Sequence, residues 1–423
     1  MPRTLTPKDA YALMEALVEQ ATGQASLAVT NTSDFVSAGE TVLQTGLENT
    51  LNSLTAVIGR MFVAVRPYGA KLGILNTISS GAYTDRMRKL SFYAKKTEPA
   101  GDWNTDLYTN LAQSYDNGTN GGASTGSQWV QNQPQILEMH FGGSSVWDYS
   151  LTQYEKQWAK ALRNESEFLD VVAGIMTQCE NDIEMEKEAF NRMTLLNKIA
   201  ATFEEASYNN GALIDVIAGF NASVGQTYTR AQVLQAHLQE FLQYLTAEFK
   251  TVSDRMTYNS IKYHWEAPRT IGGVQYVVPR HTPKRNQRAI FYNPFFTRAK
   301  STVFSEIFNP QYLEDGAKFE TVDFWQSIDG GPAISVTPAI TDMDSTSPTY
   351  GTAIAGSAVS QDYVLGCLFD EDALMIDYQF DGSNVTPVEA KKRYRNIFWH
   401  FAKNAIQDPT ENFVVFYLGA GGP

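Results

Sequence analysis

Cysteine and histidine are scarce in this chain of 423 residues, which contains two cysteines and five histidines. Cys179 and Cys367 both lie among apolar residues, so we expect two small buried side chains rather than a disulfide or a pair of metal ligands. No histidine has a partner at the spacing of a zinc site. The sequence therefore predicts a reducing compartment, no metal site and no cofactor.

Long hydrophobic runs are also absent. No stretch reaches the roughly 18 consecutive apolar residues that a membrane-spanning helix needs, and the N-terminus lacks the continuous apolar segment of a signal peptide. Positive charge is in deficit, because 33 Lys and Arg residues face 46 Asp and Glu residues, for a net charge of −13. We therefore expect no membrane partner, and no protein whose whole surface binds nucleic acid.

Motifs for catalysis are few and poorly placed. The G-x-S-x-G at residues 122–126 has polar loop on both sides, whereas a nucleophile elbow needs a strand before it and a helix after it. The acidic cluster Asp370, Glu371 and Asp372 follows an apolar, strand-like run, where a turn or a helix N-terminus is expected. We expect no enzyme. An acidic glycosidase stays an alternative, and it would need two carboxylates held across a cleft.

The dominant feature that is present is a helical pattern from about Asn164 to about Ala206, uninterrupted by proline. A helix of that length spans on the order of 60 Å, against an average of roughly 11–12 residues in globular proteins. The pattern is not a strict heptad, so we expect a spine helix across one face of a flat subunit rather than a coiled coil. Its inward positions are Phe168, Val171, Val172, Ile175, Cys179, Ile183, Phe190, Met193, Leu196, Ala200 and Phe203.

Two amphipathic helices are predicted near the N-terminus, over residues 7–22 and from about Ala38 to about Gly59. They are too small to form a core alone, so they must pack on their own body or on a neighbouring copy. Two strands are predicted at Met87–Ala94 and Gln135–Phe141, on either side of a long polar stretch. A loop of that length is uncommon within a compact domain. We expect a projecting loop whose partner is another subunit, or else a disordered surface loop.

The rest of the chain mixes the two kinds of element. We expect a helix from Thr229 to about Thr251, and residues 391–406 fit helix and strand equally well. Strand-like runs occur at residues 276–278, 289–292, 302–304, 363–369 and 413–418. With no regular alternation of strand and helix, the predicted fold class is α+β.

A basic cluster interrupts this acidic chain in the segment PRHTPKRNQR. It could contact phosphate or remain a solvated loop. In an acidic protein that self-associates, it would supply the opposite charge for a contact between subunits. The candidate contact residues in this cluster are Arg280, Lys284, Arg285 and Arg288.

Two parts of the sequence resemble the major capsid proteins of tailed bacteriophages. The N-terminal part resembles the arm of that family over residues 34–46, 51–54, 60–62 and 66–68. The C-terminal part resembles its closing strands over residues 366–374, 394–396, 398–399, 408–409 and 413–415. The middle of the chain is similar in the order of its elements more than in its letters.

The resemblance implies the capsid fold named after phage HK-ninety-seven, and it makes Tyr394–Phe401 a strand. The implied parts are an N-terminal arm (1–80), an extended E-loop (81–148), a peripheral domain with the spine helix (149–228), an axial domain (229–375) and C-terminal strands (376–423). Some members of the family cross-link a lysine of this loop to an asparagine. Lys95 and Lys96 lie in the loop, but no partner position matches, so we name them only as candidate subunit contacts.

The implied function is structural. Copies of the chain would form hexamers and pentamers of an icosahedral head that encloses double-stranded DNA without reading its sequence. The implied location is the virion, after assembly in the cytoplasm of the host bacterium. The implied partners are other copies, a portal and a separate scaffolding protein, because the arm begins close to Met1. Another virion protein, of the tail or a decoration, is the alternative.

Overall fold

The structure, a computed structural model, describes residues 7–23, 28–45, 72–73, 75–78, 86–93, 135–142, 145–154, 165–209, 211–271, 274–295, 297 and 318–422. The chain forms two compact units, each assembled from separated segments. Unit 1 takes Met1–Lys71, Ser144–Ala189 and Tyr378–Lys403, and unit 2 takes Leu72–Gly143, Phe190–Asp377 and Asn404–Pro423.

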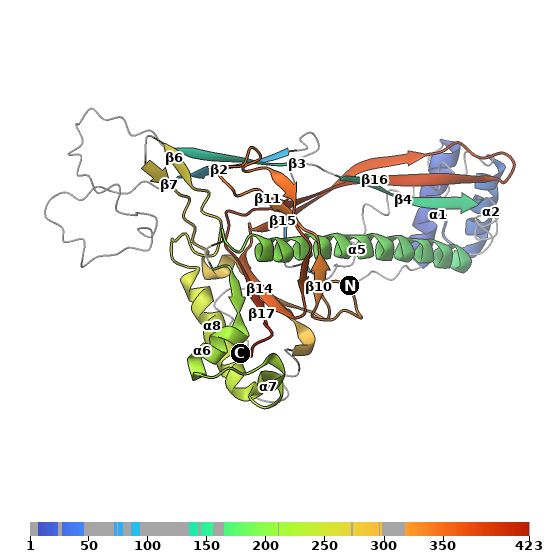
Figure 1. Cartoon of the computed structure of the whole chain (residues 1–423). Coiled ribbons are helices and arrows are strands. Elements are labelled where there is room, and N and C mark those ends of the chain that lie inside the picture. Colours follow the sequence, from blue (N-terminus) through green and yellow to red (C-terminus); the bar gives the residue numbers. More distant parts are fainter. Residues whose placement is uncertain are drawn as a thin grey trace. The chain divides into compact units, whose positions relative to one another are not determined.

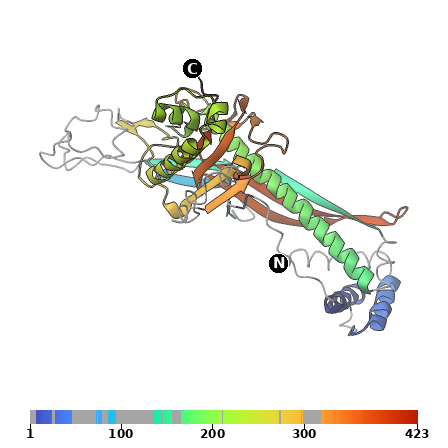
Figure 2. The same ribbon diagram turned by 90° about the horizontal axis from the view of Figure 1, so that it is seen from below.

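Helices α1 (Pro7–Thr22) and α2 (Thr32–Gln44) lie side by side in unit 1 (Figure 2). The first was predicted with these bounds. The second begins earlier than the expected Ala38, because the Asn31 side chain accepts a hydrogen bond from the Asp34 amide at 2.9 Å and caps the helix there. Its expected continuation to Gly59 lies outside the described residues.

The two arm helices bury their apolar faces inside their own chain. Met14 and Leu17 of α1 and Phe35 and Val42 of α2 are fully buried. Of the two alternatives left open by the sequence, packing on the chain's own body or on a neighbouring copy, the structure shows the first for these side chains. The helices need no neighbouring copy to shelter these four side chains.

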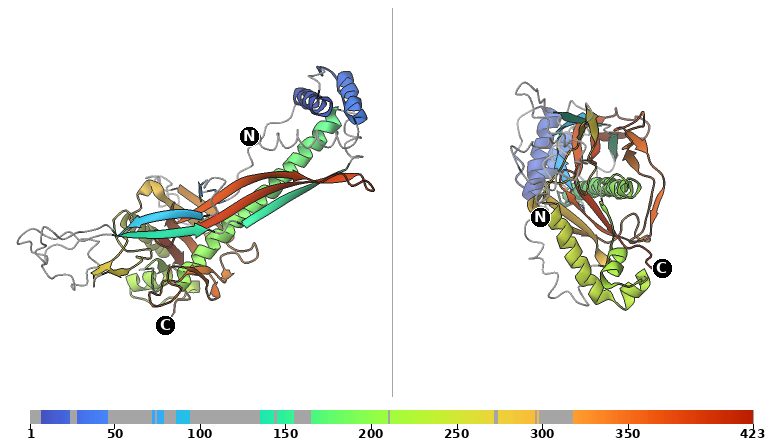
Figure 3. Two further views of the ribbon diagram at one scale, coloured as in Figure 1. Left: turned by 90° about the horizontal axis from the view of Figure 1, so that it is seen from above. Right: turned by 60° about the vertical axis from the view of Figure 1, so that its left-hand side comes forward.

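A sheet runs along the first part of helix α5 in unit 1 (Figure 3). Strand β16 (Tyr394–Gln407) pairs antiparallel with β4 (Ser145–Tyr154). The four-stranded order is β1-β15-β16-β4, where β1 (Asn76–Ile78) runs parallel to β15 (Leu374–Val385). Residues 76–78, 374–377 and 404–407 of these strands are assigned to unit 2. The inward face of the sheet contacts the helix: Tyr149 donates to Asp182 at 3.0 Å and Lys403 reaches Glu186 at 2.5 Å. Because burial alternates along β16, the ambiguous segment is a strand, as the resemblance implied.

Helix α5 (Glu165–Glu204) has 40 residues and confirms the predicted spine helix (Figure 1). The chain passes from unit 1 to unit 2 between Ala189 and Phe190. Cys179 and Ile183 are buried as predicted. The prediction is wrong for Met193, which is 56% exposed, while Leu195 and Ile199 are buried instead.

Unit 2 is organised around a five-stranded sheet whose order is β5-β17-β14-β8-β9. The central strands β14 (Val364–Asp370) and β8 (Gln287–Tyr292) are buried throughout and pair antiparallel. Gly366 is required at their contact, because a Cβ there would lie 2.6 Å from the Ile290 carbonyl oxygen. The other strands are β17 (Phe413–Tyr417), antiparallel to β14, and the parallel edge strands β5 (Leu213–Asp215) and β9 (Lys318–Val322).

Three helices belong to the same unit: α6 (Val216–Val224), α7 (Arg230–Gln235) and α8 (Leu238–Arg255). The sequence predicted one helix where α7 and α8 stand. The helix breaks because His237 leaves helical geometry at φ −118°, ψ 24°, with its ring stacked on Tyr228 at 4.1 Å between centroids. A capping box at Thr229 fixes the start of α7, as the sequence indicated.

The remaining elements of unit 2 are short, and the predicted strand at residues 302–304 lies outside the described part. In the pair β2–β3, strand β2 (Arg86–Phe92) runs antiparallel to β3 (Ile136–Gly142). The others are β6 (Arg269–Ile271) with β7 (Val274–Tyr276), β10 (Ile334–Val336) with β13 (Val359–Gln361), β11 (Ala339–Thr341) with β12 (Ala353–Ala355), and the 3₁₀ turn η3 (Lys284–Asn286).

Candidate functional site

The two strands β2 and β3 form a ribbon, which here means residues 86–93 and 135–142. Their register runs from Arg86 opposite Gly142 to Phe92 opposite Ile136, which confirms the two predicted strands. Because side chains alternate along a strand, the ribbon has two distinct faces. The loop between the strands, with Lys95 and Lys96, lies outside the described residues.

The outward face of the ribbon is apolar at one end and charged at the other. Phe92 is 62% exposed, its neighbour Leu90 is 47% exposed, and Ile136 opposite Phe92 is 44% exposed. At the other end Glu138 contacts Arg88 at 2.6 Å and His140 at 2.9 Å. Exposed ion pairs of this kind contribute little stability, so the apolar end is the informative feature of this face.

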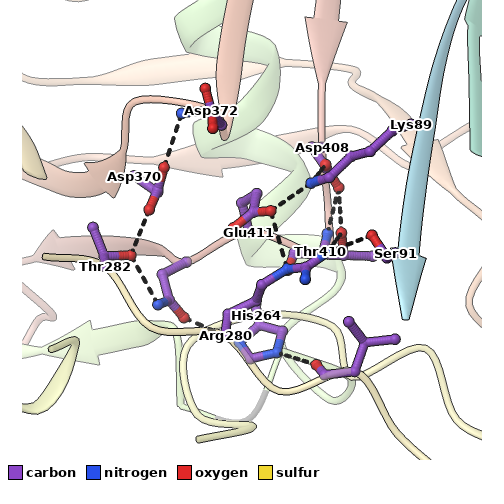
Figure 4. Close-up of polar contacts among 12 residues, drawn as sticks. Lys89, Ser91, His264, Arg280, Thr282, Asp370, Asp372, Asp408, Thr410 and Glu411 are labelled. Atoms are coloured by element: carbon purple, nitrogen blue, oxygen red, sulfur yellow. Dashed lines mark hydrogen bonds and ion pairs between the residues drawn. The ribbon is translucent and has the colours of Figure 1, made fainter. Parts of the chain in front are cut away.

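The inward face of the ribbon is anchored to a turn far along the chain. The Lys89 ammonium group contacts the carboxylates of Asp408 and Glu411 (Figure 4). The hydroxyl of Ser91, which is buried, accepts a hydrogen bond from Arg280 Nη2 at 2.6 Å. Both contacts lie within unit 2.

We call residues 408–412 the anchor turn; it joins β16 to β17. Its backbone is fixed by Asp408, whose Oδ1 accepts from the Thr410 amide at 2.8 Å and from the Thr410 hydroxyl at 2.7 Å. Arg280 Nε donates to the Thr410 carbonyl oxygen at 3.1 Å and lies 3.0 Å from Glu411 Oε1. Asp408, Thr410 and Asn412 are buried, so the inward face of the ribbon is held by a turn that is itself part of the protein interior.

The two carboxylates of the anchor turn behave differently. Burial alone would raise the pKa of Asp408, but the Lys89 charge and the hydrogen bonds from Lys89 and Thr410 outweigh burial and hold this pKa below its ordinary value. For Glu411 burial wins and raises the pKa, although Lys89 and Arg280 oppose it. Asp408 therefore carries the stable negative charge of the anchor.

Helix α5 supplies a second buried cation near this charge. Burial lowers the pKa of Lys198, while the negative charges of Glu205 and Asp408 act to raise it. Burial likewise raises the pKa of Glu205, against the effect of Lys198. Asp408 thus interacts with a lysine of the ribbon and a lysine of the helix, so the three segments share one buried charge network.

The basic cluster named from the sequence is largely engaged within its own chain. Besides Arg280 in the anchor, Arg288 is buried and contacts Glu371. Lys284 lies 2.7 Å from Asp254. Arg285 is exposed. A contact of these residues with a neighbouring copy stays a prediction.

The acidic cluster closes a turn, as expected. Asp370 Oδ1 accepts from the Asp372 amide at 2.9 Å, and the Asp370 carbonyl oxygen accepts from the Ala373 amide at 2.9 Å. Cys179 and Cys367 are both buried thiols that form no disulfide with each other. Among the residues that the structure describes, no cluster of three or more His, Cys, Asp or Glu is placed to bind a metal.

Sequence reasoning missed the anchor turn as a site, although Asp408 and Pro409 were part of the resemblance. No local pattern pairs Asp408 with Lys89, because 319 residues separate them. The helices that the structure describes include none long and apolar enough to cross a membrane.

The model of one family, the Phi29-like phage major capsid protein, matches residues 78–417, which include the ribbon, α5 and the anchor turn. The chain belongs to this family. The resemblance to major capsid proteins of tailed phages is thereby confirmed, and the chain is a structural protein of a phage capsid. In this capsid protein the α+β architecture, long helix and two-stranded ribbon are those that the HK-ninety-seven-like fold led us to expect. The division into named capsid domains stays a prediction.

Solved capsid structures are also similar to the capsid protein. The capsid of Staphylococcus phage Andhra shares 11% identity over 84% of this chain and 86% of that chain, with a TM-score of 0.49. The capsid of the cyanophage P-SCSP1u shares 11% identity over 84% and 89%, with a TM-score of 0.43. Similarity at this level does not by itself establish a function. No curated protein matches the chain.

Proposed function

We propose that this capsid protein is the shell-forming subunit of an icosahedral phage head, and that its copies assemble as hexamers and pentamers around double-stranded DNA. The observation that carries the proposal is the uncovered apolar end of the ribbon. Phe92 and Ile136 face each other across the strands and are exposed at 62% and 44%. A two-stranded sheet with an open apolar face is a poor final state in water, so a second copy would cover it.

Charge also favours a second copy as the partner. Between residues 86 and 96 the sequence has no acidic residue, whereas the whole chain has a net charge of −13. The cations of this segment are Arg86, Arg88, Lys89, Lys95 and Lys96. Lys89 and Arg88 are paired within the chain, so Lys95 and Lys96 supply the charge that would complement the acidic surface of a neighbouring copy.

The contact is heterologous, because the ribbon of one copy meets a different surface of the next. Contacts of this kind form rings when the rotation closes, and rings of five and six can tile a closed shell. The acidic balance of the chain suits a container for a polyanion, because the shell would confine the DNA by geometry without gripping it. A portal and a separate scaffolding protein would complete the assembly in the host cytoplasm.

The test is assembly of a ribbon variant. In Phe92→Asp with Ile136→Asp, charges replace the apolar end of the outward face without touching the anchor. We expect wild-type protein to form large closed particles in negative-stain micrographs and in sedimentation velocity, and the double variant to remain as single subunits. The control is Ile328→Asp, which places a charge at an apolar residue of unit 2 that is 79% exposed and lies between β9 and β10, outside the ribbon strands.

The outcomes separate the possibilities. Wild-type-sized particles from the double variant would show that this face is not the interface. A wild-type protein that stays strictly monomeric would remove the shell proposal altogether. Tubes or stacked rings in place of closed shells would indicate a tail component.

A further inference from the structure

At the anchor turn, four buried side chains are linked by hydrogen bonds, and Figure 4 labels three of them, His264, Thr282 and Asp370. His264 Nδ1 lies 3.0 Å from Asn412 Oδ1, Asn412 Nδ2 donates to Thr282 Oγ1 at 3.0 Å, and Thr282 Oγ1 donates to Asp370 Oδ2 at 2.7 Å. None of the four residues is more than 5% exposed. We call this set, His264, Asn412, Thr282 and Asp370, the relay.

The relay joins four separate segments at one end of the five-stranded sheet. His264 follows α8, Thr282 precedes η3, Asp370 ends β14 and Asn412 ends the anchor turn. Water has little access to these groups, so each donor and acceptor must find its partner inside the relay or in the adjacent backbone. Its hydrogen bonds can therefore be counted.

The count begins at His264, whose ring faces only acceptors. Nε2 lies 2.9 Å from the Val278 carbonyl oxygen, and Nδ1 lies 3.0 Å from Asn412 Oδ1 and 3.2 Å from the Lys262 carbonyl oxygen. A neutral imidazole has one N–H, and only the protonated ring has two. With Asn412 oriented in this way, every contact is satisfied when His264 is protonated and Asp370 is ionised.

A second arrangement satisfies the contacts within the relay, but His264 Nδ1 then no longer donates to the Lys262 carbonyl oxygen. If the proton resides on Asp370, the carboxylic acid donates to Thr282, Thr282 donates to Asn412, and the exchanged amide of Asn412 donates to a neutral His264. Both arrangements contain one proton. Removing it leaves two acceptors facing each other somewhere in the relay, and adding another leaves two donors facing each other.

We propose that His264 and Asp370 hold one shared proton through Asn412 and Thr282, and that the folded chain keeps this proton at least one pH unit above the range in which an ordinary histidine loses it. An unsatisfied buried hydrogen-bonding group disfavours the deprotonated relay by about tenfold or more. The hydrogen bonds that the relay makes between the segments around the anchor turn thus depend on this proton.

The electrostatic surroundings agree with sharing. Burial lowers the pKa of His264, against its three hydrogen bonds, and the Arg280 charge adds to the lowering. Burial raises the pKa of Asp370, against its hydrogen bonds from Asp372 and Thr282, and the charges of Asp372 and Glu371 add to the rise. Arg288 balances Glu371. The two pKa values move toward each other, which is the condition for a proton to reside on either group. The lowered pKa of His264 works against keeping the proton above pH 7, so the proposal requires the hydrogen-bond count to outweigh burial.

The proton count sets a pH signature. In the unfolded chain, histidine loses its proton near pH 6.5 and aspartate near pH 3.9. Above about pH 7 the unfolded pair therefore binds no proton while the folded pair binds one. Stability then falls as the pH rises, and the unfolding equilibrium constant increases about tenfold from pH 7 to pH 8 through this pair alone.

The test compares wild type with Asp370→Asn in the full-length chain, unfolded by denaturant at one protein concentration. The amide mimics the protonated carboxyl group, so it keeps the relay satisfied with a neutral His264 and no shared proton. We expect the ratio of the unfolding constants, wild type over variant, to rise about tenfold between pH 7 and pH 8. Asp372→Asn removes the same charge two residues away, outside the relay, and its profile should run parallel to wild type.

Two further measurements keep the proposal falsifiable. Thr282→Val interrupts the relay with little change of shape and should remove the slope as Asp370→Asn does. In ¹⁵N NMR of labelled histidines, the signal of His264, assigned with His264→Gln, should stay constant from pH 5 to pH 8. Parallel profiles for wild type and Asp370→Asn would overturn the proposal, as would a His264 signal that changes with a midpoint near pH 6.5, the pKa of an ordinary histidine.

Discussion

The two faces of the ribbon use the same two strands for opposite purposes. Lys89 and Ser91 point inward and end in a buried charge network, whereas Leu90 and Phe92, one residue away in each case, are exposed. The inward face is fixed within its own chain, and our proposal assigns the outward face to a partner. Substitutions at neighbouring residues of one strand are thus expected to have different effects: those on the inward face lower the stability of the subunit, and those on the outward face impair assembly.

The largest expected effect comes from Lys89→Met. The substitution keeps the length of the side chain but removes the ammonium group that contacts Asp408, and leaves Glu411 with Arg280 alone. Breaking a buried pair in this way costs about 3–5 kcal/mol. We expect a loss of stability of that order in denaturant unfolding. Arg88→Met, on the outward face of the same strand, is the control, and equal losses for the two variants would contradict the comparison.

The two carboxylates that contact Lys89 on the inward face are expected to differ in how much stability they contribute. Asp408→Asn should cost more stability at pH 7 than Glu411→Gln, because the folded chain favours the charged form of Asp408 and disfavours that of Glu411. Thermal unfolding of the two variants at pH 7 measures this order. If Glu411→Gln loses more stability than Asp408→Asn, then Glu411, and not Asp408, carries the essential negative charge.

Acid should weaken the anchor through Asp408. Its folded pKa lies below the unfolded value near 3.9, so its stabilising contribution is present above that value and is lost as the pH falls through the folded pKa. The stability difference between wild type and Asp408→Asn should therefore shrink between pH 4 and pH 2. A difference that stays constant over this range would show that Lys89 does not stabilise the carboxylate.

The smallest expected effect on stability belongs to the outward face. Phe92→Ser removes an exposed side chain, and such changes are usually within about 0.5 kcal/mol. The variant should unfold like wild type and yet assemble poorly in sedimentation velocity. If it loses stability as Lys89→Met does, the distinction between the two faces fails.

The parts of the fold that the sequence predicts best are those with a local cause. Helix α5 follows from apolar spacing without proline, and β2 and β3 were predicted as the two strand-like runs on either side of a long polar stretch. Met193 was misplaced because the helix enters unit 2 at Phe190, where it is packed on several sides and a single stripe no longer describes it. The break at His237 depends on a ring stacked on Tyr228, which helical spacing does not reveal.

The candidate site was harder to predict than the fold. The basic residues Arg280 and Arg288 are visible in the sequence as a cluster, but their acidic partners are 83 residues or more away, and the cluster alone does not indicate that its charges are balanced within the chain. The relay is still less visible, because Asn412 and Thr282 are ordinary residues until folding places them between a histidine and an aspartate.

The separation in sequence between the ribbon and the anchor turn also determines which of the two is synthesised first. The ribosome makes Lys89 first and Asp408 some 319 residues later, a delay on the order of 15–60 seconds at bacterial elongation rates. Throughout that interval the ribbon has no carboxylates to hold it. A chain cut short before the anchor turn carries a ribbon without a fixed base, so only finished copies can present it in the orientation that a growing shell would accept.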